Sequence, residues 1–100
     1  MDEKKEEDFL RVISLKGTRD ILKYLDKHGM AQHQQLDAFI NTCTLNRRLN
    51  QLLKYSLIQH HLDKKDARRE WYSLTERGKK ILKHLEDMIL AVEGPYIDSR

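Results

Sequence analysis

The sequence predicts a mainly helical α+β domain with three helices, a β-hairpin and a long C-terminal helix, in that order. Three observations lead to this prediction. Apolar residues recur at helical spacing between residues 18 and 55. Two short segments rich in β-forming residues then flank a polar loop. Helical spacing returns over residues 75–93, ahead of the helix-breaking Gly94-Pro95. With 100 residues, the chain has the size of one domain.

The N-terminal region divides into a charged and an apolar part. Residues 1–8 hold two lysines and five acidic residues, and we expect them to form an acidic flexible tail. The domain itself is expected over residues 9–93. Its first segment, residues 9–15, is apolar enough to pack either as a short helix or in an extended form, because periodicity does not decide. Residues 94–100 are expected to form a C-terminal tail.

The first well-defined helix is expected between Thr18 and Gly29. Thr18 can cap its start, and Gly29 can end it because glycine adopts the left-handed conformation at little cost. One face of this helix is apolar, with Ile21, Leu22 and Leu25 at helical spacing. A short second helix is expected over about 32–40, and Asn41-Thr42 interrupts it because either side chain can cap a new helix.

The third helix is expected over about 42–55. Leucines at positions i, i+4, i+7 and i+8 share one face, namely Leu45, Leu49, Leu52 and Leu53. The opposite face carries side chains that donate hydrogen bonds, namely Asn46, Arg47, Asn50, Gln51 and Lys54. A helix with this division packs on one side and presents donors on the other.

Two strands are expected at residues 57–62 and 70–74, joined by a polar loop. The loop contains four cations, Lys64, Lys65, Arg68 and Arg69. Thr75 then caps the final helix, with Glu76 in its first turn, where the helix dipole favours an anion. The apolar face of this helix is wide and includes Ile81, Leu82, Leu85, Met88, Ile89 and Val92. One edge of that face can cover the core and the other can meet a second chain; the alternative is that the whole face packs internally.

Charge and motifs limit the classes of function. Residues 42–84 hold eleven Lys and Arg against four Asp and Glu, a net charge of +7, whereas both ends of the chain are acidic. Such a block is typical of nucleic-acid binding, although a lysine-rich surface without a partner has the same composition. Phosphate-binding loops and nucleophile elbows are absent from the sequence, so we expect no enzyme. We also expect no cofactor and no metal, since His60 and His61 point to opposite faces of one strand.

Three stretches carry a resemblance to a known group. Tyr72-Ser73-Leu74-Thr75-Glu76-Arg77-Gly78 resembles the end of the hairpin and the start of the last helix in winged helix-turn-helix regulators of the HxlR, PadR and MarR-like groups of prokaryotes, archaea included. Thr44 to Leu52 is similar to their recognition helix. Leu52 to Ile58 is similar to their exit from that helix, with Ser56 where glycine is usual. The resemblance implies a winged helix-turn-helix fold over about residues 16–92.

This resemblance implies a cytoplasmic, dimeric regulator of transcription that binds double-stranded DNA and no membrane. The recognition helix, about 42–55, would enter the major groove, and the basic wing, 63–70, would contact the backbone or the minor groove. Expected DNA-binding residues are Thr42, Asn46, Arg47, Arg48, Asn50, Lys54, Lys64, Lys65, Arg68 and Arg69. Asn46 and Arg47 are the expected base readers. Arg48 has two interpretations, a phosphate contact or an ion pair with an acid such as Glu70.

The dimer interface is expected on the last helix, about 75–93, through Leu82, Leu85, Met88, Ile89 and Val92. The sequence is also compatible with two other functions. A winged helix can serve as a protein-binding module, or as a sequence-tolerant DNA binder of the nucleoid type. Cys43 near a helix start is either a redox sensor or a packed small residue.

Overall fold

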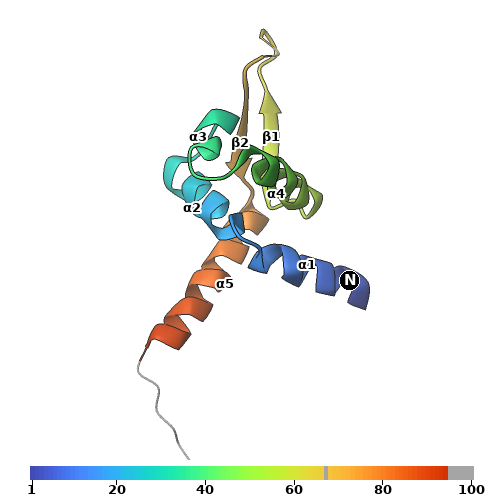
Figure 1. The fold of residues 1–100 in the computed structure, drawn as a ribbon, viewed down its shortest axis with the longest axis vertical. Coiled ribbons are helices and arrows are strands. Elements are labelled where there is room, and N and C mark those ends of the chain that lie inside the picture. The colour runs from blue at the N-terminus through green and yellow to red at the C-terminus, as the bar shows by residue number, and fades with distance from the viewer. Residues whose placement is uncertain (67, 95–100) are drawn as a thin grey trace, which may run out of the picture.

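The computed structural model describes residues 1–66 and 68–94 and contains five helices and one β-hairpin in these residues. The order is α1 (Glu3–Ser14), α2 (Thr18–His28), α3 (His33–Asp37), α4 (Thr42–Lys54), β1 (Ile58–Leu62), β2 (Glu70–Leu74) and α5 (Glu76–Glu93). The hairpin projects from one end of the body formed by α2, α3 and α4, whereas α1 and α5 extend from the other end (Figure 1). The predicted fold class is confirmed.

The N-terminal expectation was wrong in one respect. Residues 3–8 are not an irregular tail, because α1 begins at Glu3 and continues into the apolar segment. The Asp2 side chain caps this helix by accepting a hydrogen bond from the Lys5 amide at 2.8 Å. The acidic residues of the first turn favour the helix start because they oppose the positive end of the helix dipole. Val12 is the residue of α1 that is fully buried.

Thr18 does not cap α2, contrary to the prediction. The N-cap is Gly17, and Thr18 is fully buried with its hydroxyl donating to the Val12 carbonyl at 2.7 Å. This bond joins the end of α1 to the start of α2. The C-terminal prediction is confirmed, since Gly29 ends the helix with a φ of +83°. The second helix is shorter than expected and ends at Asp37.

The hairpin is antiparallel and is held to the helices at its base. Strands β1 and β2 pair in a register that places Ile58 opposite Leu74 and Leu62 opposite Glu70. Ala31, just after α2, pairs with the outer edge of β2 through two backbone hydrogen bonds with Tyr72, at 3.0 and 2.8 Å. Three segments therefore meet at the base of the hairpin, and its far end is left free to project.

One core joins α1, α2, α3, α4, the hairpin base and α5. Its fully buried side chains come mostly from the predicted apolar faces and include Ile21, Leu22, Leu25, Leu36, Leu45, Leu52, Leu57 and Ile58. Gly78 lies in the first turns of α5, where a Cβ atom would be 2.1 Å from the Leu57 carbonyl oxygen. A residue with a Cβ atom would therefore overlap the backbone at this position. Thr75 caps α5 by accepting from the Gly78 amide at 2.9 Å.

Candidate nucleic-acid interface

Helix α4 is fixed in place by its cap and by its leucines. The Asn41 side chain accepts hydrogen bonds from the amides of Cys43, at 2.9 Å, and Thr44, at 3.5 Å, so it satisfies free donors at the helix start. Leu45, Leu49 and Leu52 are buried, and Leu53 is partly buried against the same core. The orientation of α4 therefore follows from its apolar stripe, and the opposite face must point outward.

That outward face carries four of the predicted DNA-binding residues, of which Thr42 is the first. Asn46, Arg47 and Asn50 are exposed on successive turns, and α4 contains no acidic residue. Arginine and asparagine are the side chains that most often bond to purine edges in the major groove. The arrangement can hydrogen-bond to an edge rich in acceptors, and it offers positive charge beside it.

Two residues of α3 bond to side chains on this face of α4. The Asp37 carboxylate accepts a hydrogen bond from the Thr42 hydroxyl at 2.5 Å. The His33 ring, through Nε2, bonds to the Asn46 side-chain oxygen at 2.7 Å. Neither Asp37 nor His33 was predicted to take part in the site. No local pattern could have indicated them, because each bond depends on how α3 is docked against α4.

Arg48 is held inside the protein, so the ion pair with Glu70 suggested from the sequence was wrong, and its phosphate contact stays a prediction. Its side chain is buried, with Nε donating to the Lys16 carbonyl at 2.9 Å and an Nη donating to Gln51 at 3.1 Å. Burial lowers the pKa of the guanidinium, and the neighbouring Arg47 and Arg11 lower it further. Glu70, the suggested partner, instead lies 2.9 Å from His60. Arg48 thus attaches α4 to the turn between α1 and α2.

Lys54, at the end of α4, faces α1. Its ammonium group lies 3.2 Å from the Asp8 carboxylate, which also accepts hydrogen bonds from the Tyr55 hydroxyl and, at 2.6 Å, from Arg11. The hydrogen bonds from Tyr55, Arg11 and Lys54 hold the pKa of Asp8 well below its ordinary value. The Phe9 ring packs edge-on against Tyr55, with ring centroids 5.2 Å apart. Lys54 therefore belongs to the α1–α4 contact.

The loop of the hairpin presents the four expected cations. Lys64, Lys65, Arg68 and Arg69 are all exposed, and Arg68 pairs with Asp66 at 3.2 Å. The side chains of Asp63 and Asp66 accept hydrogen bonds from the amides of Lys65 and Arg68, at 2.8 and 3.0 Å. These aspartates give the loop a defined path and at the same time reduce its positive charge.

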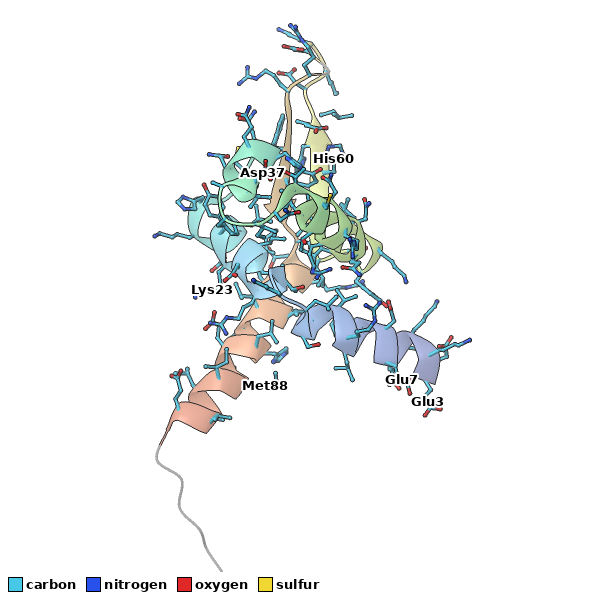
Figure 2. The ribbon with its side chains drawn as sticks, viewed as in Figure 1. Glu3, Glu7, Lys23, Asp37, His60 and Met88 are labelled. Carbon is cyan, nitrogen blue, oxygen red and sulfur yellow. The ribbon has the colours of Figure 1, made fainter. Side chains whose placement is uncertain are left out.

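The apolar face of α5 separates into a buried and an exposed part. Leu82 is buried in the domain core, which leaves little of its side chain to contact a second chain as the sequence predicted. Leu85 packs partly against the same core. Met88 and Val92 are exposed, at 59% and 84%, and Ile89 is partly exposed. Figure 2 shows Met88 on α5, at the end of the molecule away from His60 and the hairpin.

The other side chains singled out from the sequence are one cysteine and two adjacent histidines. Cys43 is exposed at the start of α4. His60 stacks on Tyr72 and His61 stacks on Trp71, on opposite faces of β1. The described residues include no group of three or more potential metal ligands. In the same residues, every helix is too short or too polar to cross a membrane.

Comparison with known proteins gives one family and several related folds. A family model described as HxlR-like helix-turn-helix matches residues 12–96. A mutant of S. aureus MepR is similar to the chain with a TM-score of 0.73 and 20% identity, over 91% of this chain and 69% of that one. A MarR family transcriptional regulator from Silicibacter pomeroyi has a TM-score of 0.66 and 24% identity, over 78% and 54% of the two chains.

A third solved structure is a mutant of E. coli MarR complexed with operator DNA. Its TM-score is 0.67 and its identity 15%, over 82% of this chain and 61% of that one. The chain thus spans less than two thirds of the length of the S. pomeroyi and E. coli proteins. No curated protein matches the chain.

Proposed function

Because the chain belongs to the HxlR-like helix-turn-helix family, we propose that it is a transcription regulator that binds specific sequences of double-stranded DNA as a homodimer. In this proposal α4 enters the major groove and the hairpin loop lies on the adjacent backbone or minor groove. One solved structure with the same fold, the E. coli MarR mutant, is complexed with operator DNA. That complex supports the class of ligand.

The exposed face of α4 is the observation that carries the proposal. A helix fits the major groove, where Arg bonds to guanine and Asn to adenine through paired hydrogen bonds. Arg47 and Asn50 are exposed on this face, and no acidic residue of α4 would repel phosphates. We assign base contacts to Arg47, Asn46 and Asn50, and a contact at the groove edge to Thr42.

The hairpin loop would supply affinity more than sequence preference. Its cations Lys64, Lys65, Arg68 and Arg69 are exposed at the end of a hairpin that projects past α4 (Figure 1). Contacts from such residues to phosphates position a protein on the duplex and carry little sequence information. Each phosphate neutralised is expected to steepen the salt dependence of binding by about 0.9 log units per log unit of salt.

We assign the dimer interface to the exposed part of α5. Met88, Ile89 and Val92 form an apolar strip beyond the domain core, and Leu85 continues it toward the core. Burial of an exposed apolar strip is favourable, and in a twofold dimer the strips of the two copies can bury each other. Two α4 helices would then meet half-sites about 34 Å apart on a palindromic operator.

The proposal assigns no catalytic step to the chain. It places the protein in the cytoplasm of a prokaryotic cell, because its proposed ligand is genomic DNA. A protein-binding module and a sequence-tolerant DNA binder, the two other functions considered from the sequence, would differ from this one in whether they select a DNA sequence.

The test is selection from a random duplex pool, followed by titration of the enriched duplex by fluorescence anisotropy across a range of salt concentrations. We expect a palindromic sequence, and Arg47→Ala is expected to cost about 1–3 kcal/mol at one position of each half-site. Lys80→Ala is the matched control, because Lys80 is an exposed cation on α5. Binding without an enriched sequence would favour the nucleoid-type function. No binding at low salt would favour the protein-binding module.

A further inference from the structure

The hydrogen bond between His33 and Asn46 joins the two helices of the helix-turn-helix at its outer face. His33 is the first residue of α3 and is partly buried, whereas Asn46 is exposed one turn into α4. The His33 Nε2 atom and the Asn46 Oδ1 atom are 2.7 Å apart, a normal hydrogen-bond distance. Of the exposed residues on α4 to which we assign base contacts, Asn46 thus has its side-chain oxygen engaged by the protein itself.

This contact changes what the amide offers to a base. A free asparagine reads adenine by donating from its NH₂ group to N7 and accepting from N6. When His33 donates to the oxygen, it turns that oxygen toward α3 and leaves the NH₂ group as the outward part of the side chain. A histidine donates from Nε2 in its Nε2–H neutral form and in its protonated form, so the contact does not require one charge state.

We infer that His33 determines the base preference of Asn46 by holding it as a hydrogen-bond donor. A donor matches guanine, whose N7 and O6 are both acceptors in the major groove. It matches adenine poorly, because the adenine N6 amino group needs an acceptor. Asn46 therefore selects guanine over adenine in this protein, in contrast to the preference of an unconstrained asparagine. This inference rests on the proposed DNA-binding function.

The structure also shows why an exposed side chain has a fixed orientation here. The α4 backbone at this point is capped by Asn41, and the adjacent Leu45 is fully buried. At the other end of the contact, α3 is held by buried Leu36 and by a capping box in which the Gln32 amide donates to Gln35 at 2.8 Å. Both partners therefore stand on anchored helix starts.

The test uses the full chain and the enriched duplex, with either guanine or adenine at the position that Asn46 reads. That position is the base pair at which Asn46→Ala abolishes the preference of the protein for one base. The wild-type protein is expected to prefer guanine, and His33→Phe, which keeps a ring of similar size and removes the donor, is expected to shift the ratio toward adenine by about tenfold. Gln34→Ala is the control, because Gln34 is exposed on the same helix. It should leave the ratio unchanged.

A second variant covers the case in which His33→Phe does not fold. Asn46→Asp keeps an acceptor for His33 and loses the donor, so we expect it to lose the guanine preference. A wild-type preference for adenine, or a ratio that His33→Phe leaves unchanged, would overturn the inference while the proposed function stands. Failure of every variant and of the wild type to bind DNA would overturn both.

Discussion

Tyr55, the C-cap residue of α4, donates a hydrogen bond from its hydroxyl to the carboxylate of Asp8 in α1. This contact ties the N-terminal helix to the helix proposed to read DNA. Lys54 and Arg11 bond to the same carboxylate, so one acidic group holds together three donors from two helices. The end of α4 is thereby positioned by a segment far away in the sequence.

The Asp8 contact predicts a specific loss of stability in acid. The pKa of Asp8 is held below its ordinary value of 3.8, so its contribution is complete above that pH and is lost as the pH falls toward the lower folded pKa. We expect Asp8→Asn to lower the free energy of unfolding at pH 7 and the difference from wild type to narrow near pH 3. Urea unfolding at the two pH values measures this. Glu7→Gln, an exposed neighbour, is the control, and an equal effect of both changes would contradict the assignment.

The hydrogen bond of Tyr55 predicts a loss of stability in alkaline solution. The hydrogen bond to Asp8 and burial raise the pKa of this phenol above 10.0. Its stabilising effect is therefore present below pH 10 and is lost as the pH rises through the folded pKa. In Tyr55→Phe, the fall in stability between pH 9 and pH 11 is expected to be smaller than in wild type. Thermal unfolding across this range tests it, and identical slopes would argue against the contact.

Adjacent arginines are predicted to have different roles. Arg48→Ala should lower the free energy of unfolding by about 2–3 kcal/mol, because it leaves the Lys16 carbonyl without its charged donor. Arg47→Ala should change stability by less than about 0.5 kcal/mol, since Arg47 is exposed, and should act on DNA affinity instead. Chemical unfolding and DNA titration of both variants separate the two roles. Equal losses of stability in the two variants would show that the buried contact of Arg48 contributes nothing to the free energy of unfolding.

Substitutions at two backbone positions are expected to change the free energy of unfolding in opposite directions. Gly78→Ala should destabilise by about 2–3 kcal/mol, because the new Cβ would overlap the Leu57 carbonyl oxygen, and backbone does not move aside easily. Ser56→Gly should stabilise by about 0.5–1 kcal/mol, because Ser56 has a φ of 58°, a conformation that costs a residue with a Cβ atom. Ser56→Ala keeps that cost and should show no gain. Thermal unfolding of the three variants is the measurement.

The exposed strip of α5 predicts the effect of charge on assembly. Met88→Glu combined with Val92→Glu should turn the dimer into a folded monomer, because charges would be buried in the apolar contact. Leu90→Glu adds a charge at an exposed apolar residue on the opposite face of the helix and should leave the dimer intact. Sedimentation measures the mass, and circular dichroism confirms folding. A wild-type chain that is already monomeric would rule out this interface.

Leu82 separates the core from the interface on the same helix. Because Leu82 is buried inside its own domain, Leu82→Ala should lower the free energy of unfolding by about 2–5 kcal/mol. Sedimentation at low temperature should still show the dimer, since the strip itself is unchanged. A loss of dimer without a loss of stability would return Leu82 to the interface.

Periodicity was sufficient to place α4 and α5 in the sequence. The leucine spacing of α4 and the N-cap at Thr75 are local signals, because each depends only on residues within one or two helical turns. Composition was a poorer guide at residues 3–8, where the many charged residues suggested a tail. A helix formed there because the acidic first turn suits the helix dipole and because Phe9 and Val12 pack against the body.

From Thr18 onward, the sequence alone determined the order of the elements, the outward position of Asn46, Arg47 and Asn50, and the basic hairpin loop. Tertiary structure alone decided the partners of those side chains. Arg48 is spaced like a DNA-contacting residue, yet it bonds to a carbonyl 32 residues away. Asn46 faces outward, yet His33 engages its oxygen from another helix. Periodicity fixes which side of a helix is buried, but a hydrogen bond between helices depends on how they dock, and docking is set by the shape of the shared core.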